Sequence, residues 1–324
     1  MTDVTVIVIT YNSRACLPEL KAALEAQTRP FRLRVWDNAS EPEQRPRAQD
    51  LPQCAEITQS EENLGFAAAN NRCAALVDTP YMALLNPDAF PAPDWLDRLI
   101  DAATRYPAAV GFGSTQVKAR SPHVFDGLGD AYHVVGASWR GGHGAARANL
   151  QPREGYTFAV CAAAALYRVQ AWRDVGGFDE RLFCFGEDVD LAFRLRLRGW
   201  ELVQAAHAVV HHVGGASTST RSGFEIFHNA RNTMWVFVKN MPAPLLWLAA
   251  PLHALKTLAH YALSFARKDG ASYRRGVDAG LAGLSETWRA RGDVRRSVAS
   301  TWRIVRALTW SPLALALRAP KIWR

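Results

Sequence analysis

The chain has 324 residues, 49% of them hydrophobic and 21% charged, a balance typical of a globular protein and not of a disordered chain. Its net charge of +8 is unevenly placed, because residues 267–324 carry a net +9 and the first 266 residues therefore carry −1. Five cysteines without zinc-like spacing indicate free thiols in a reducing compartment, and hence a cytoplasmic protein. The N-terminus lacks the features of a secretion signal, and residues 243–265, the most apolar long stretch, are interrupted by Pro251 and by basic residues. We expect no membrane-spanning helix.

The first hundred residues alternate between strand and helix patterns. Val4–Thr10 is an unbroken apolar, β-branched run, as expected for a strand buried on both faces, and leucines at one-turn spacing in residues 17–24 indicate a helix. Further strands and helices are expected at residues 33–36, 55–58, 66–77, 81–85 and 95–105. This order predicts a doubly wound, mostly parallel α/β sheet whose ligand lies at the carboxyl ends of the strands, where Asp37 and Asp88 fall.

The second half of the chain is less regular. Residues 111–144 are rich in glycine and histidine and predict either hairpins or a mobile loop, while the apolar residues 156–167 predict a strand. A helix opens at Gly186-Glu187-Asp188 and ends before Gly199. From Phe224 to the end the pattern is helical and amphipathic. We therefore expect an α/β domain at residues 1–222 and a basic helical region at residues 223–324, whose first helix (224–241) closes the α/β domain.

Two aspartates at strand ends are candidates for binding a nucleotide. Asp88, in Asn86-Pro87-Asp88, could hold a Mg²⁺ or Mn²⁺ ion that neutralises a diphosphate, although Asn-Pro-Asp is also a good turn sequence. Asp37 could accept a hydrogen bond from the imide N–H of uracil or thymine, or it could simply form an Asx turn.

A second acidic pair and two histidines follow. Glu187 and Asp188 could stabilise the helix dipole, or one could act as a general base that deprotonates an acceptor hydroxyl. His211 and His212 could reach a metal or a phosphate, but adjacent strand residues point in opposite directions, so at most one should reach the site. No GxGxxG, Walker A or GxSxG sequence is present, which counts against a dinucleotide oxidoreductase, an NTPase and an α/β-hydrolase.

The order of these segments is more specific than any one of them. The segments are Thr10-Tyr11-Asn12, Asp37-Asn38-Ala39-Ser40, Asn63-Leu64-Gly65-Phe66-Ala67, Leu84-Leu85-Asn86-Pro87-Asp88, Gly176-Gly177-Phe178-Asp179-Glu180, Gly186-Glu187-Asp188-Val189-Asp190-Leu191, and His211/His212 with Gly214 and Ser217. This succession, over about residues 3–240, resembles the family 2 glycosyltransferases of the GT-A fold, and in particular their rhamnosyltransferase-like branch.

The resemblance implies a role for each segment. Asp188 would be the catalytic base of an inverting transfer, with Glu187 and Asp190 at the acceptor. Asp88 would hold the divalent metal together with His212 or His211. The nucleotide-sugar site would comprise Thr10, Tyr11, Asn12, Asp37, Asn63, Gly65, Phe66, Asn86 and Asp88. Many relatives have an aspartate at the position of Asn86, so this motif carries one carboxylate fewer.

The basic tail predicts a partner of its own. Its tryptophans alternate with arginines, which favours an anionic membrane surface at the inner face of the cytoplasmic membrane; a nucleic acid is disfavoured because no nucleic-acid-binding fold accompanies the charge. A helical packing surface, for instance in a homodimer, is the alternative.

The predicted activity is transfer of a sugar, plausibly L-rhamnose from dTDP-rhamnose, to a polyprenyl-diphosphate-linked glycan in bacterial polysaccharide or O-antigen-type synthesis. A UDP- or GDP-hexose is the alternative donor. A nucleotidyltransferase and a non-catalytic basic binding protein are the alternatives of other classes.

Overall fold

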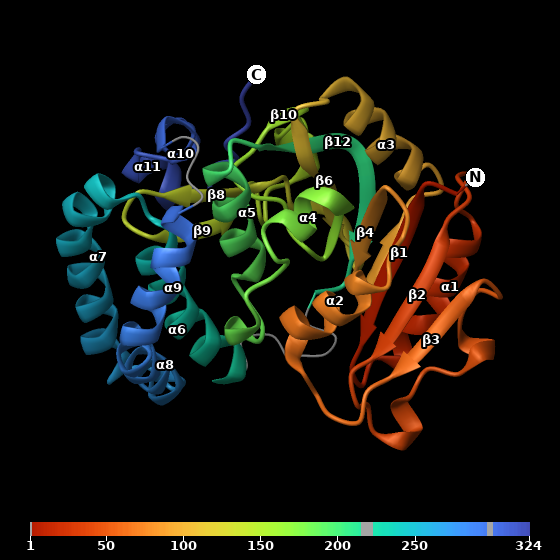
Figure 1. Ribbon diagram of the computed structural model, residues 1–324, viewed down its shortest axis with the longest axis horizontal. Helices are drawn as coiled ribbons and strands as arrows, with labels where there is room; N and C mark the ends of the chain where they lie inside the picture. Colours follow the sequence, from red (N-terminus) through yellow and green to blue (C-terminus); the bar gives the residue numbers. More distant parts are fainter. Residues whose placement is uncertain (1, 215–222, 297–300) are drawn as a thin grey trace.

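The computed structural model describes residues 2–214, 223–296 and 301–324, which form a mixed ten-stranded sheet flanked by helices, with a helical layer beside it (Figure 1). The strand order is β10-β12-β6-β11-β4-β1-β2-β3, with β5 paired to β12 and β7 paired to β6. The predicted α/β class with a C-terminal helical extension is confirmed. Ser217 and the expected domain boundary at residue 222 lie outside the described residues.

The parallel half of the sheet comes from the first third of the chain. Its strands are β1 (Val4–Thr10), β2 (Arg32–Asp37), β3 (Ala55–Gln59) and β4 (Tyr81–Leu85), and its helices are α1 (Leu17–Glu25), α2 (Gly65–Ala75) and α3 (Trp95–Arg105). All seven residues of β1 are buried, since the strand pairs with β2 on one side and β4 on the other. These elements confirm the predicted ranges, with small shifts at the ends.

The other half of the sheet contains most of the antiparallel pairings. It comprises β5 (Ala89–Pro91), β6 (Ala109–Lys118), β7 (Ser121–Gly127), β10 (Gly155–Tyr156), β11 (Ala164–Arg168) and β12 (Glu201–His212), and a separate hairpin of β8 (Asp130–His133) and β9 (Ala137–Arg140) lies beside it. Residues 111–144 are thus hairpins, the first of the two alternatives. The single strand predicted at 156–167 is wrong: this stretch splits into β10 and β11, and the residues between them are apolar because they are buried, not because they form a strand.

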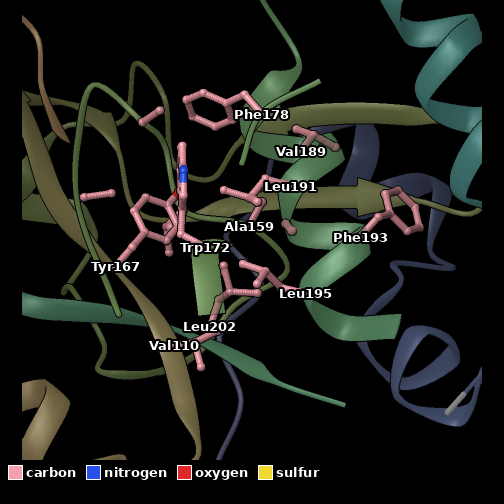
Figure 2. Packing of buried hydrophobic residues seen from close by; sticks show 14 of the residues in the cluster. Val110, Ala159, Tyr167, Trp172, Phe178, Val189, Leu191, Phe193, Leu195 and Leu202 are labelled. Atoms are coloured by element: carbon pink, nitrogen blue, oxygen red, sulfur yellow. The ribbon is translucent and has the colours of Figure 1, made fainter. Parts of the chain in front are cut away.

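The largest hydrophobic core lies between the sheet and the helix that follows the Gly186 loop. Figure 2 shows Leu191 and Leu195 of α5 (Glu187–Leu197) directed toward strand residues such as Leu202, with Trp172 and Phe178 beyond them, whereas Phe193 lies on the other side of the helix. There its ring packs against Tyr132 and Phe158. Because α5 is fixed along its length by this packing, the position of its first turn is fixed as well.

In the part that the structure describes, the C-terminal region consists of helices and their connections. Its helices are α6 (Gly223–Asn240), α7 (Ala243–Ser264), α8 (Gly270–Ala282), α9 (Leu284–Arg296), α10 (Thr301–Ala307) and α11 (Pro312–Ala316). A short helix, α4 (Val169–Asp174), follows β11 earlier in the chain. Helix α6 contacts α5, α8 and α9, whereas α7 lies at the edge of the molecule farthest from β1–β3 (Figure 1). Within the described part of the chain, we find no helix that is both long and apolar enough to cross a bilayer.

Candidate active site

The carboxyl ends of β1 and β2 place a buried aspartate beside two hydroxyl groups. Thr10 and Asp37 are register partners, and the Thr10 hydroxyl donates to Asp37 Oδ1 over 2.9 Å. The Ser40 hydroxyl donates to the same oxygen over 2.6 Å, and the Ser40 N–H donates to Oδ2 over 3.2 Å. The Asx-turn geometry is therefore present, and it holds the carboxylate in one orientation at the strand end. Tyr11, the next residue after β1, is 38% exposed at the same edge.

Asparagine side chains connect this edge to the start of α2. Asn38 Nδ2 donates to Asn63 Oδ1 over 2.8 Å, and the Gly65 N–H donates to the same oxygen over 2.9 Å. Gly65 has φ +80°, and a Cβ there would lie 2.5 Å from the Phe183 ring, so glycine is required. The Asn12 N–H donates to the Ser40 hydroxyl, which ties the first loop to the second. The predicted donor residues of β1, β2 and α2 thus form one continuous edge.

A cavity of about 270 Å³ lies beside this edge and carries the acidic pair. Phe66 and Asn86 line it from the side of the parallel strands, and Glu187 and Asp188 line it from the first turn of α5. Asn86 Oδ1 and Glu187 Oε2 are buried oxygens without a hydrogen-bond partner among the described residues. Buried polar atoms of this kind usually have a partner, so the cavity is suited to a polar ligand.

The loop that opens α5 has an unusual backbone. Phe183, Phe185 and Gly186 have φ of +63°, +70° and +84°, and non-glycine residues in this region store strain that is typical of functional sites. The loop is held from α6, where the Asn232 side-chain nitrogen lies 2.7–2.9 Å from three backbone oxygens of residues 182–185. Asp188 accepts hydrogen bonds from the N–H groups of Val189 (2.8 Å) and Ala162 (3.3 Å). Its carboxylate is therefore oriented before any ligand binds.

The second candidate cluster joins Asp88 to a histidine. Antiparallel pairing of β5 and β12 sets His212 opposite Ala89, and the Val213 N–H donates to the Asp88 backbone oxygen over 2.9 Å. His212 Nε2 lies 3.4 Å from Asp88 Oδ1, and its Nδ1 lies 2.8 Å from Asp126 Oδ2. His212 is buried, whereas the neighbouring His211 is only half-buried. Of the two histidines, the structure places His212 beside Asp88.

Asp126 connects this cluster to the cavity. Its carboxylate lies beside His212 and also accepts a hydrogen bond from Arg140 Nη1. Arg140 in turn lines the cavity. Burial opposes the charge on Asp126, but hydrogen bonds from His143 and His212 and the charge of Arg140 hold its pKa well below the usual range. Asp126 is therefore an anion that fixes both the imidazole and the guanidinium.

Two carboxyl groups and a thiol lie near Asp188 in the cavity. One oxygen of Asp130, one of Asp188 and the Cys161 sulfur lie within 4.8 Å of one another, and Glu187 is the neighbouring residue of the same helix turn. Burial, and then repulsion from Asp188, raise the pKa of Asp130 to about 8 and that of Glu187 to about 8. Burial also raises the pKa of Asp188, against its backbone hydrogen bonds. Carboxyl groups with raised pKa values in a cavity are typical of acid–base sites.

Asp190, expected at the acceptor, lies elsewhere. Its side chain is fully buried between α5 and α6, where it pairs with Arg194 Nε (2.8 Å) and Lys239 Nζ (2.5 Å) and accepts from Asn240 Nδ2 (2.7 Å). Burial opposes its charge, yet Lys239 and Arg194 hold its pKa below the usual value. Asp190 and Arg194 are four residues apart on α5, a spacing that favours an ion pair on a helix. The geometry makes Asp190 an anchor between two helices, and it does not support acceptor contact.

The raised pKa of Glu187 predicts a pH-dependent stability. A carboxyl with a folded-state pKa of about 8 and an unfolded-state value of about 4 stabilises the fold fully below pH 4, and this contribution is lost as pH rises through about 8. Glu187→Gln removes the loss, so we expect its melting temperature to exceed that of the parent by about 6 °C more at pH 9 than at pH 5. Thermal melts at both pH values measure this. Glu19→Gln, on the exposed face of α1, is the control, and equal shifts at both pH values would contradict the assignment.

Several site residues were missed by the sequence analysis. Three of them lie on the β7–β9 hairpins, namely Asp126, Asp130 and Arg140. Cys161 lies in the connection before β11, and Asn232 lies on α6. A signal was present for two of them, because Asp126 and Asp130 are the only carboxylates in residues 111–144. Without the hairpin register, nothing showed that Asp126 lies beside His212 or that Asp130 lies beside Asp188.

Comparison with known proteins places this geometry in a family. The model of the family described as "Glycosyl transferase family 2" matches residues 5–175. The N-acetylglucosaminyl-diphospho-decaprenol L-rhamnosyltransferase of Mycobacterium tuberculosis is 29% identical over 290 residues, which cover 78% of this chain and 89% of that protein.

Solved structures agree at the level of the fold. A mannosyltransferase from Pyrobaculum calidifontis, in complex with GDP-Man and Mn²⁺, superposes with a TM-score of 0.52 at 15% identity, covering 98% of this chain and 84% of that one. GalNAc-T7 with UDP, GalNAc and Mn²⁺ gives a TM-score of 0.63 at 13% identity, with coverages of 94% and 56%. At these identities the likeness shows the fold alone.

Proposed function

The chain belongs to glycosyl transferase family 2, and within this family of enzymes we propose that it transfers L-rhamnose from dTDP-rhamnose to a lipid-diphosphate-linked sugar, with inversion. The observation that carries the proposal is the cavity in which the Asp188 carboxylate, on the acceptor side, faces the carboxyl end of β4, where the donor is expected. The choice of rhamnose and of a lipid diphosphate rests on the mycobacterial relative. A UDP- or GDP-hexose remains the alternative donor.

Asp188 has the position of a general base. Two backbone N–H groups fix its orientation, and burial raises its affinity for a proton. A raised pKa favours proton acceptance near neutral pH, as a base in an inverting displacement requires. Glu187, with a carboxyl oxygen that lacks a partner in the described chain, lies where it could bind an acceptor hydroxyl.

The arrangement around Asp88 fits a divalent cation, Mg²⁺ or Mn²⁺. His212 Nε2 is buried without a hydrogen-bond partner among the described residues and lies toward Asp88 Oδ1, while Nδ1 is held by Asp126. A carboxylate on the far nitrogen is the usual support of a metal-binding histidine. Held by Asp88 and His212, the cation would offset the charge of the departing diphosphate. Asp126 and Arg140 keep His212 in place.

The donor edge fits a nucleotide. Asp37 presents a carboxylate at the end of β2 that Thr10 and Ser40 hold in one orientation. Tyr11, whose ring is exposed, directly follows Thr10, the register partner of Asp37 on β1. We propose that the nucleobase of the donor binds at Asp37 and Tyr11, and that its sugar and phosphates lie along Asn63, Gly65 and Asn86.

A thermal-shift panel with UDP, GDP and dTDP sugars, each with Mg²⁺ or Mn²⁺, tests the donor, and a transfer assay onto N-acetylglucosaminyl-diphospho-lipid tests the reaction. We expect dTDP-rhamnose to give the largest stabilisation and to be consumed in the assay. A larger shift with a UDP- or GDP-hexose, and transfer of that sugar, would replace rhamnose as the donor.

We also propose that the C-terminal helices bind an anionic membrane surface. Helix α7 exposes five large apolar side chains, those of Trp247, Leu248, Leu252, Leu255 and Leu258. A cluster of exposed apolar side chains of this size usually marks an interaction site. The basic residues of the tail would lie against anionic head groups.

Substituting the apolar face of α7 should release the protein from membranes. We expect Leu252→Glu with Leu255→Glu to weaken binding to phosphatidylglycerol vesicles by about tenfold or more, because each leucine loses its burial in lipid. Vesicle flotation measures this, with Ile57→Glu plus Leu76→Glu, also exposed, as control. If the parent does not float and the α7 variant instead loses a dimer seen by sedimentation, the face is a homodimer contact.

A further inference from the structure

Helix α7 turns two polar side chains inward in its second half. Leu246 and Ala249 pack inward in its first half, and His253 and Lys256 follow on the inward side, whereas Leu252, Leu255 and their neighbours face outward and are more than half exposed. A surface helix usually buries its apolar residues and exposes its polar ones. The inward polar groups and the exposed leucines are therefore two features of α7 that a ligand could satisfy.

The inward side of α7 borders a large groove. The groove has a volume of about 1010 Å³ and is walled by α6, α7, the α7–α8 connection and the β8–β9 turn. It adjoins the active-site cavity, because Ser138, Asn229 and Thr233 line both. A ligand that passes these three residues would reach from the cavity into the groove.

The groove contains a set of basic side chains. Lys256, Arg267 and Lys268 line it together with His260, and Glu225 and Asp269 are the carboxylates of the lining. Lys256 Nζ donates to the backbone oxygens of Gly136 (3.0 Å) and Val135 (3.4 Å), which leaves a third N–H for a ligand.

His253 provides an independent observation. It is 6% exposed, stacks on Phe237, and has Nδ1 2.9 Å from the Val135 backbone oxygen. A carbonyl oxygen only accepts, so Nδ1 carries a proton, and the buried Nε2 has no partner in the described chain. Burial, with the charge of Lys256, lowers the pKa of His253 to about 4. An anion beside Nε2 would favour its protonation, so that both ring nitrogens donate.

We propose that this groove binds the diphosphate of a polyprenyl-diphosphate-linked acceptor, with the acceptor sugar in the Asp188 cavity and the prenyl chain passing onto the outward face of α7. The inference rests on the proposed function for the nature of the acceptor. The groove lies between the cavity and α7. Sugar, diphosphate and lipid would therefore follow one another along the protein in the order that they have in the acceptor. The cations pair with the diphosphate, and the exposed leucines take the chain.

Direct binding of farnesyl diphosphate to the full chain, without donor, tests this site. Arg267→Gln with Lys268→Gln, both exposed, should lower the affinity by about tenfold or more, and Lys256→Gln should do so as well. Arg275→Gln with Arg289→Gln removes the same charge outside the groove lining and should change the affinity by less than about twofold. Binding of the donor nucleotide serves as the measure of folding in each variant.

Two further probes separate the contributions of phosphate and lipid. Inorganic pyrophosphate should bind more weakly than farnesyl diphosphate but lose affinity in the same variants, and farnesol should be indifferent to them. If both groove variants bind farnesyl diphosphate as the control does, the inference is overturned. This result is distinct from failure of the proposed function, which would appear as absence of rhamnosyl transfer while groove-dependent diphosphate binding persists.

Discussion

Asp188→Asn is expected to lower turnover by about 10²–10⁴-fold, the range over which general-base catalysis contributes. Asparagine has nearly the same shape and retains an oxygen that accepts from the Val189 N–H, so the first turn of α5 stays in place. What is lost is the carboxylate that, in the proposed mechanism, would take the acceptor proton. Nucleotide-sugar binding should be unchanged, because the donor edge is built from β1, β2, β4 and α2.

Steady-state transfer rates and donor affinity, measured together, check this prediction. Asp101→Asn, an exposed carboxylate on α3, is the matched control and should behave like the parent. Near-normal turnover in a folded, nucleotide-binding Asp188→Asn protein would remove Asp188 as the base. If Glu187→Gln or Asp130→Asn then abolished turnover, the base would be one of these neighbours.

Asp88→Asn is expected to raise the metal concentration needed for half-maximal activity by about tenfold or more, because a neutral amide oxygen binds Mg²⁺ or Mn²⁺ more weakly than a carboxylate. The backbone hydrogen bond from Val213 does not involve the side chain, so β5 and β12 should remain paired. Activity of the chelator-treated protein, followed as metal is added back, measures the effect.

Asp126→Asn tests the same proposed cation site through His212, by the same measurement of metal affinity. Asp126 lies 2.8 Å from His212 Nδ1, the nitrogen on the far side of the ring from Asp88, so its loss should cost on the order of 10–100-fold in metal affinity through the orientation of the imidazole. Full activity in excess chelator, or a metal dependence shifted by Asp130→Asn and not by Asp88→Asn, would place the metal elsewhere or exclude it.

The parallel half of the fold was predictable from local pattern. Val4–Thr10 and Tyr81–Leu85 are short apolar runs between turn residues, and the leucines of α1 repeat at helical spacing, so each element shows its own period. The ends of these strands then gave the positions of Asp37 and Asp88. Their chemical meaning came from the order of several motifs, since each alone also fits a turn.

The other half depends on contacts that no local pattern records. Asp126 reaches His212 because β7 and β12 both pair with β6, and Asp130 reaches Asp188 because a hairpin folds over α5. The placement of Asp190 was missed for the same reason: its partner Lys239 lies 49 residues further along the chain, on α6. Strand register places His212, and not His211, beside Asp88, whereas the sequence alone left both residues open.

The hold that Asn232 has on the loop before Asp188 has a consequence for engineering. A chimaera that joins residues 1–222 of this chain to the tail of a relative would separate the loop from Asn232, the side chain that fixes it. The Asp188 carboxylate would then lose its orientation, and the chimaera could not use the acceptor that the new tail was meant to bind. A junction after α6, near Met241, keeps loop and support from one parent. Acceptor exchange by tail swapping should therefore succeed at the later junction and yield inactive protein at the earlier one.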